Sequence, residues 1–339
     1  LSFFLKFKIC DVAVVCFFFF FILLNLLINI PADNKYIFSQ INHYIQIPIY
    51  TLFFFTIFRT YHLKLINFVN HNKMFFLLIS ISTIFFFYFR NDIFLYEFTL
   101  INLIILIVFS PLFSDDQEKV KIKNIYFISF ILLLAFLTTR LTFLFSLAFF
   151  LTLYFYKNFF YILLIRLFGI FLILYPFIIL FIFDENTLAF FIELDHNTYY
   201  RFQSIMLSGD LIKNDIFLIF FGKGFGFPYR ELINNDLSTL HHFNDFESIN
   251  TIPNHNSFFD FFYRFGLLGF IPLFWLLLKS IFVNATKNYY SRQINTLTFF
   301  IIFQLSFNPW AEDQNQLIML SFLIALVTYL FIFYKIKKK

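Results

Sequence analysis

Charged residues are scarce in this chain: Asp, Glu, Lys and Arg make up 13% of its 339 residues, against about a quarter in an average soluble domain. Hydrophobic residues make up 60%, and the mean hydropathy is +0.79. This balance excludes an ordinary soluble domain and predicts a polytopic membrane protein. The net charge of +5 does not indicate nucleic-acid binding, because the basic residues are dispersed in short loops between apolar segments, as membrane topology requires.

Cysteine and glycine are also rare. Cys10 and Cys16 both lie at the start of the first apolar segment, so no cysteine is left in a loop for a disulfide or a structural metal site. Five of the seven glycines fall between residues 222 and 269, namely Gly222, Gly224, Gly226, Gly266 and Gly269. We expect the backbone there to need the freedom of glycine, and the last two glycines to let another helix approach closely.

Apolar segments that could cross a bilayer recur along the chain, since a span needs about 20 residues. We predict an all-α polytopic integral membrane fold with about ten transmembrane helices and no soluble domain large enough to fold alone. The predicted spans are residues 10–30, 45–58, 74–89, 93–113, 124–139, 141–156, 159–183, 256–279, 294–309 and 316–334. We expect the first to be retained, because no small-residue cleavage site follows it.

The distribution of Lys and Arg sets the predicted orientation. With the N-terminus in the cytoplasm, sixteen of the 25 basic residues fall in cytoplasmic segments and seven on the other side, as the positive-inside rule requires. Both termini are then cytoplasmic, and the long polar segment 184–254 is extracytoplasmic. Within it, residues 199–220 predict one or two amphipathic helices at the membrane surface, interrupted near Ser208 and Gly209. A glycine-rich turn at 222–226 follows.

A polar stripe enters the apolar segment that follows this loop. His255 stands at its start, and Asn256, Asp260 and Arg264 recur four residues apart, which places them on one helix face. Ionisable groups inside a membrane segment are candidates for function. The alternatives are a structural helix cap for His255 and a buried structural ion pair for Asp260 and Arg264.

Two arginines lie on the predicted outer side of the membrane. Arg140 follows two threonines in a hairpin between two spans, and Arg201 follows two tyrosines at the start of the amphipathic region. Arginine suits bidentate recognition of phosphate at an interface. Each of these residues could instead be a topological determinant or a contact to a lipid headgroup.

Two other patterns in the loop predict no chemistry. The sequence Gly-Lys-Gly-Phe-Gly-Phe-Pro at 222–228 lacks the strand-turn-helix context of a nucleotide-binding loop, and we expect it to fold back under the membrane. His241, His242 and the acidic residues around them match no metal-ligand spacing, so a solvated loop without a metal is predicted.

Together these residues resemble the O-antigen ligase and O-antigen polymerase superfamily of bacterial envelope glycosyltransferases. The ligase signature, His-[Asn/Ser/Gln]-x9-Gly-x2-Gly, is matched by His255, Asn256, Gly266 and Gly269. The turn at 222–226, Arg201 about twenty residues before it, and Arg140 in its hairpin are also similar to the family. The resemblance covers about residues 125–280, including one large periplasmic loop that ends at the histidine.

The resemblance implies that a glycan is transferred from a polyprenyl-diphosphate carrier to an acceptor hydroxyl at the periplasmic face of the bacterial inner membrane. No metal or other cofactor is implied; the partners are the lipid-linked donor, a lipid or glycan acceptor, and membrane lipids. His255 would act as general base, and Arg140 and Arg201 would neutralise the diphosphate. The residues assigned to substrate binding are Asn256, Asp260, Arg264, Gly224 and Gly226.

The predicted organisation follows from this resemblance. Residues 1–123 form N-terminal transmembrane helices, residues 124–280 form an O-antigen ligase-like core that includes the periplasmic loop, and residues 281–339 form C-terminal transmembrane helices. The acceptor is left open between lipid A core, another carrier-linked repeat unit and a protein. A transporter or flippase of a lipid-linked glycan is the main alternative, but it predicts inverted repeats that are not obvious in the chain. The polar stripe argues against a purely structural membrane scaffold.

Overall fold

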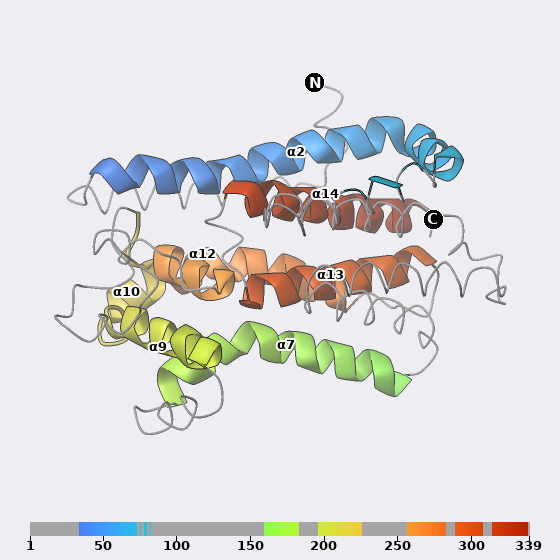
Figure 1. Cartoon of the computed structure of the whole chain (residues 1–339). Helices are drawn as coiled ribbons and strands as arrows, with labels where there is room; N and C mark the ends of the chain where they lie inside the picture. Colours follow the sequence, from blue (N-terminus) through green and yellow to red (C-terminus); the bar gives the residue numbers. More distant parts are fainter. Residues whose placement is uncertain are drawn as a thin grey trace. The chain divides into compact units, whose positions relative to one another are not determined.

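All regular structure that can be described in this protein is helical. The computed structural model describes residues 34–72, 75, 78, 79, 82, 159–182, 196–225, 256–282, 289–307 and 314–337. These residues contain no strand (Figure 1), which confirms the all-α class for this part of the chain. The spans predicted at 10–30, 93–113, 124–139 and 141–156, and almost all of the span at 74–89, lie outside the described residues.

The helices match most of the predicted segments within the described ranges. They are α2 (Asn34–His71), α7 (Phe159–Ile182), α9 (His196–Asp210), α10 (Ile216–Phe221), α12 (Ser257–Ile281), α13 (Tyr289–Phe307) and α14 (Gln314–Lys337). The ends of α7 and α12 fall within two residues of the predicted ends. Long apolar runs bounded by polar clusters are therefore sufficient to find these helices.

α2 is much longer than the span predicted at 45–58. It runs for 38 residues, or about 57 Å at 1.5 Å per residue, and it continues as far as His71. The loop predicted at 59–73 is therefore wrong up to that residue. Arg59 and Lys64 interrupt the apolar run, but long unbranched side chains lose little rotamer freedom in a helix, so their charge does not end it.

α7 is the described helix that is long and apolar enough to cross a membrane, over Phe160–Ile182. Shorter apolar stretches occur at Ile294–Ser306 in α13 and Leu317–Ile332 in α14. Residues three and four apart along one face of α7 are apolar and exposed, namely Phe160, Leu164, Leu167, Phe171, Leu174 and Phe181. Its other face is also apolar but buried. α7 therefore lacks the polar face of a helix at the surface of a soluble protein, and it is not buried all round as a core helix is.

α9 and α10 cover the region 199–220, where one or two short helices were predicted, but the break between them comes later than predicted. Ser208 and Gly209 lie inside α9, and residues 211–215 form the connection. Asp215 begins α10, because its carboxylate accepts hydrogen bonds of 2.8 and 3.4 Å from two backbone N–H groups of the first turn. This N-cap, rather than the glycine, sets the position of the break.

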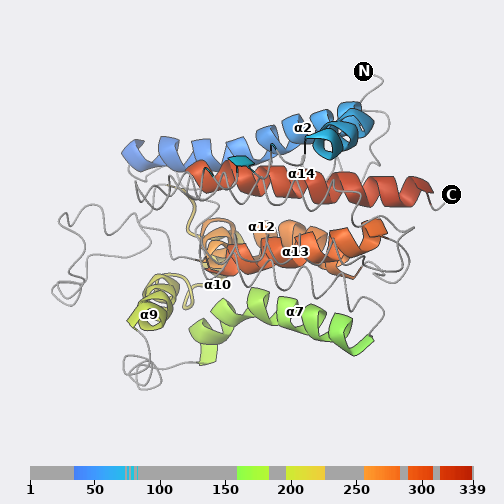
Figure 2. The ribbon, with the colours of Figure 1, turned by 45° about the vertical axis from the view of Figure 1, so that its right-hand side comes forward.

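The chain divides into two compact units. The first unit comprises residues 1–48, 169–278 and 302–317. Within it, α9 and α10 lie beside the start of α12 and the end of α7 (Figures 1 and 2). The first three turns of α12 are buried on all sides, and its fully buried side chains include Phe258, Phe259, Phe262, Tyr263 and Arg264. This unit contains the polar stripe.

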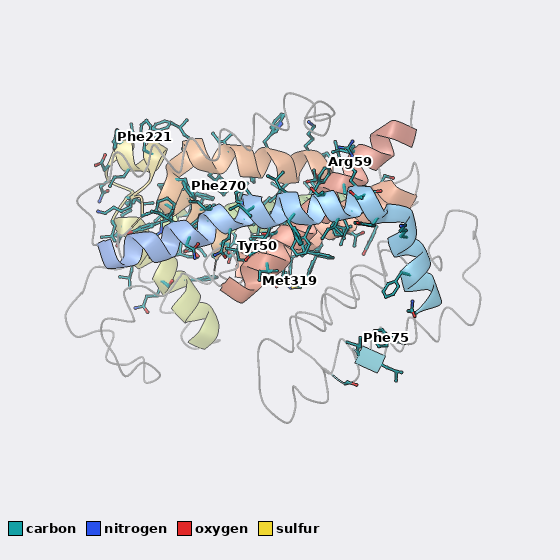
Figure 3. All side chains as sticks on the ribbon, turned by 90° about the horizontal axis from the view of Figure 1, so that it is seen from above. Tyr50, Arg59, Phe75, Phe221, Phe270 and Met319 are labelled. Atoms are coloured by element: carbon teal, nitrogen blue, oxygen red, sulfur yellow. The ribbon has the colours of Figure 1, made fainter. Side chains whose placement is uncertain are left out.

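The second unit comprises residues 49–168, 279–301 and 318–339. Its core is aromatic: Phe58 on α2 lies with its ring centroid 5.3 Å from that of Phe322 and 6.1 Å from that of Tyr329, both on α14. Figure 3 shows Tyr50 and Arg59 on α2 and Met319 on α14 from above. Such rings bury large areas, and each pair adds about 0.5–1.5 kcal/mol.

Candidate functional site

α12 is interrupted at Gly266, where φ is 62° and ψ is −169°. This left-handed backbone is strained for every residue with a Cβ. A helix broken at this point cannot continue its regular hydrogen-bond ladder, so the carbonyl groups just before the break need other donors. The local geometry therefore gives a physical reason for glycine at this position of the signature.

The turn at 222–225 supplies these donors. The N–H of Lys223 donates to the Tyr263 carbonyl at 2.7 Å, and the N–H of Gly224 donates to the Arg264 carbonyl at 3.2 Å. Both carbonyls belong to the turn of α12 that precedes Gly266. The two glycine-bearing segments, 222–225 and 263–266, form what we call the turn–kink contact.

The turn–kink contact leaves no room for side chains on its glycines. A Cβ on Gly222 would lie 2.6 Å from the Gly266 nitrogen, and a Cβ on Gly266 would lie 2.5 Å from the Phe221 nitrogen. Both obstacles are backbone atoms, which cannot move aside as a side chain can. The close approach predicted at Gly266 is confirmed, and the segment that approaches is the end of α10 together with the turn.

Aromatic side chains fix the turn from its other side. Phe225 is 1% exposed, and its ring centroid lies 5.4 Å from those of Tyr44 on α2 and Phe265 on α12. The Tyr44 ring also meets Phe261 and Phe265 edge-on, at 5.3 and 5.1 Å. Edge-to-face packing of this kind is a preferred arrangement of aromatic rings, so these rings pack the turn against α12.

Arg264 is fully buried and bonded to the turn. Its Nη1 donates to the Gly224 carbonyl at 3.0 Å, and its guanidinium carbon lies 5.3 Å from the centre of the Tyr263 ring. Asp260, one turn earlier, is also fully buried. Two of the predicted substrate-binding residues, Arg264 and Gly224, thus contact each other directly, and the charge of Arg264 stabilises the turn.

Asn256 caps α12 and is fully buried. Its Oδ1 accepts a hydrogen bond of 2.9 Å from the N–H of Phe259, as an N-cap side chain does. Its Nδ2 donates to the Tyr175 hydroxyl at 2.7 Å and to the Ser306 carbonyl at 2.9 Å. The amide orientation is determined by these partners, because a backbone carbonyl only accepts and a backbone N–H only donates.

Tyr175 and Ser306 complete this polar network. The Tyr175 hydroxyl donates to the Ser306 carbonyl at 2.6 Å. The Ser306 hydroxyl shares its one hydrogen between the carbonyls of Leu172 and Ile302, at 3.0 and 2.7 Å. Sequence reasoning missed both residues. The available signal was weak: a tyrosine beside a proline inside the apolar run of α7, and a serine near the end of the apolar run of α13.

The Tyr175 ring also meets α9. Its centroid lies 6.5 Å from that of Phe202, with the ring planes inclined at 49°. Phe202 is the residue after Arg201, and Asn256 is the residue after His255. Direct contacts of Tyr175 therefore adjoin two of the three residues to which the resemblance assigns catalytic roles.

The remaining predicted site residues are described less completely. His255, Arg140 and Gly226 lie outside the described residues, and Arg201 is described only as part of the backbone of α9. In the parts of the chain that the structure describes, no three His, Cys, Asp or Glu side chains gather as metal ligands would.

Comparisons of the chain with protein-family models, with curated proteins and with solved structures find no match.

Proposed function

We propose that this protein is a bacterial envelope glycosyltransferase of the O-antigen ligase and polymerase type. It transfers a glycan from a polyprenyl-diphosphate carrier to a hydroxyl of an acceptor, which is the lipid A core or another repeat unit. The reaction takes place at the periplasmic face of the inner membrane. About ten transmembrane helices with both termini in the cytoplasm carry the periplasmic loop 184–254.

The observation that carries this proposal is the turn–kink contact. The chain resembles the superfamily through two separate glycine motifs, the turn at 222–226 and the signature that contains Gly266. A chance similarity gives no reason for two such motifs to meet. In this protein they meet backbone to backbone, and residues 40 apart in sequence, Arg264 and Gly224, are hydrogen-bonded across the contact.

The proposed reaction uses the three residues to which the resemblance assigns catalytic roles. The acceptor hydroxyl attacks the anomeric carbon of the glycan, and the bond from that carbon to the diphosphate oxygen breaks. His255 accepts the hydroxyl proton as general base, and polyprenyl diphosphate leaves with the bonding electron pair. Arg140 and Arg201 hydrogen-bond to the diphosphate and stabilise the charge that develops on it.

The exposed face of α7 supports the membrane part of the proposal. A helix with apolar residues on both faces, one of them open, is stable where lipid replaces water around it. In water the exposed residues Phe160, Leu164, Leu167 and Phe171 would form a continuous apolar patch of the kind that soluble monomers avoid.

The test is a deletion of the gene in its source bacterium, complemented with wild type or His255→Ala. A lipopolysaccharide gel and the lipid-linked glycan pool are read in parallel. Loss of core-attached glycan with accumulation of long polyprenyl-linked chains identifies a ligase, and a single repeat left on the core identifies a polymerase. In either case His255→Ala should behave as the deletion does.

His241→Ala is the matched control, because it removes a histidine of the same predicted loop that lies outside the signature. It should restore the wild-type ladder at equal protein level on an immunoblot. A normal ladder from His255→Ala overturns the proposal and favours the transporter.

A further inference from the structure

The structure leaves Asn256 little capacity to bind substrate. Both hydrogens of its amide are taken, one by the Tyr175 hydroxyl and one by the Ser306 carbonyl, and its Oδ1 holds the first turn of α12. The side chain is also fully buried. Asn256 follows the proposed base directly in the signature. Its position there is explained by its role as the cap that fixes the start of α12.

Tyr175 is one of two residues that fix the start of α12 to the rest of the first unit; the other is Ser306, whose carbonyl Asn256 contacts directly. The Tyr175 hydroxyl accepts a hydrogen bond from Asn256, which caps α12, and donates one to Ser306 on α13; these residues are respectively 81 and 131 positions away in sequence. Its ring lies against Phe202 on α9. One side chain on α7 thus contacts both Asn256, the residue after His255 in sequence, and Phe202 on the helix that carries Arg201.

We infer that Tyr175 is a positioning residue for the glycosyl transfer, acting through Asn256 on His255 and through Phe202 on the helix of Arg201. This inference rests on the proposed function. It adds a residue to which neither the sequence motif nor the resemblance assigns a role. Tyr175 is 9% exposed, and its effect is transmitted by packing and hydrogen bonds rather than by contact with the reacting atoms.

The physical reason is the sensitivity of group transfer to distance. The base must meet the acceptor hydroxyl, and the arginine must meet the diphosphate, while both substrates are aligned. A displacement of about 1 Å can reduce the rate of such a reaction about a hundredfold. A buried network whose members are mutually bonded holds its elements more precisely than apolar packing alone.

Tyr175→Phe tests the inference, because it removes the hydroxyl and keeps the ring against Phe202. The purified variant is assayed in detergent with the lipid-linked glycan and the core lipid extracted from the deletion strain as donor and acceptor. We expect kcat to fall about tenfold to a hundredfold, while KM for the extracted donor stays within about twofold of the wild-type value, since uniform binding is unchanged. A wild-type kcat overturns the inference.

Asn256→Asp is the second variant. It keeps the cap of α12 but turns a carboxylate oxygen toward the Ser306 carbonyl in place of the donor. We expect a similar fall in kcat, and we expect the double variant Tyr175→Phe with Asn256→Asp to be no slower than the slower single variant. Residues that act as one unit show this non-additivity. Two independent losses from poorer folding would instead multiply, and that outcome also overturns the inference.

Two further variants separate the possible failures. Tyr329→Phe removes a hydroxyl from a buried tyrosine of α14 in the second unit and should retain wild-type kcat. His255→Ala should be inactive in the same assay. If His255→Ala is inactive and Tyr175→Phe is fully active, the positioning role alone is wrong. If His255→Ala is fully active, the proposed function is wrong, and the positioning role that rests on it is wrong too.

Discussion

Gly222 and Gly266 meet backbone against backbone: a Cβ on Gly222 would lie 2.6 Å from the nitrogen of Gly266. Both residues have positive φ, 78° and 62°. Gly222 ends α10 and Gly266 interrupts α12. The two backbones can come this close because neither glycine has a side chain. This contact determines which residues of α12 the glycine-rich turn lies against. It thereby brings the Gly224 carbonyl within reach of the Arg264 side chain.

Gly266→Ala should destabilise the protein strongly. The new Cβ meets the backbone of Phe220 and Phe221, and the left-handed conformation adds strain of about 1–3 kcal/mol. Neither cost can be relieved by a side-chain rotation. We expect a fall of several degrees or more in the thermal unfolding temperature in detergent, measured by tryptophan fluorescence, together with loss of glycosyl transfer.

Gly209→Ala provides the comparison for this prediction. Gly209 lies in α9, and the three atoms nearest to its Cβ would be side-chain carbons of Leu180. Those carbons can move by a change of rotamer, and alanine favours the helix by about 1 kcal/mol over glycine. We expect a distinctly smaller change than for Gly266→Ala. Equal unfolding temperatures for the two variants would contradict the backbone contact at Gly266.

Arg264→Leu should be destabilising even though leucine is apolar and the site is buried. The guanidinium donates to the Gly224 carbonyl at 3.0 Å, and a hydrogen bond from a charged group contributes about 1.5–3 kcal/mol. The substitution leaves that carbonyl without this donor. We expect a loss of stability of this order, measured by chemical unfolding in detergent.

Lys213→Ala is the matched control for a lost cation. Lys213 forms an ion pair with Asp210 on the surface, where the two side chains are 37% and 51% exposed. Such pairs contribute about 0–1 kcal/mol. If Arg264→Leu is no less stable than Lys213→Ala, the buried arginine does not hold the turn.

The sequence predicted the elements of the first unit better than their connections. The limits of α7 and α12 follow from long apolar runs, which are a local pattern. The need for glycine at position 266 is indicated by the scarcity of glycine outside residues 222–269. The end of α2 could not be found in the same way, because Arg59 and Lys64 are as compatible with a helix as with a loop.

The polar network was not predictable for a different reason. The partner of Tyr175 at Ser306 is 131 residues away, and no local pattern encodes a bond between such distant positions. For the same reason Asn256 was assigned to substrate binding: its position after the histidine is visible in the sequence, whereas the hydroxyl and carbonyl that occupy its amide are not. Whether it also meets substrate stays a prediction.

The orientation in the membrane can be measured with single cysteines. In a background in which Cys10 and Cys16 are replaced by serine, Asn235→Cys should react with a membrane-impermeant thiol reagent added to spheroplasts, and Asn288→Cys should not. The charge distribution predicts these two positions on opposite sides. After lysis both should react, which controls for accessibility. The reverse pattern in intact spheroplasts contradicts the orientation.

Arg201→Lys should lose most of the transfer activity although it keeps the positive charge. The guanidinium presents a planar pair of donors that matches two diphosphate oxygens, whereas an ammonium is a point charge that cannot form the bidentate contact. Loss of one preorganised donor at a site of developing charge costs about a hundredfold or more in kcat. We expect the fall in kcat with the extracted donor to be of this order.

Arg230→Lys is the matched control, because it makes the same change in the same predicted loop at a position outside the resemblance. Its kcat should equal that of the wild type. Arg201→Lys should also retain the wild-type unfolding temperature, since the contact of Phe202 with Tyr175 does not depend on the neighbouring side chain. Full activity of Arg201→Lys would leave Arg201 as a surface anchor and assign the diphosphate to other cations of the loop, of which Lys223 in the turn is the first to test.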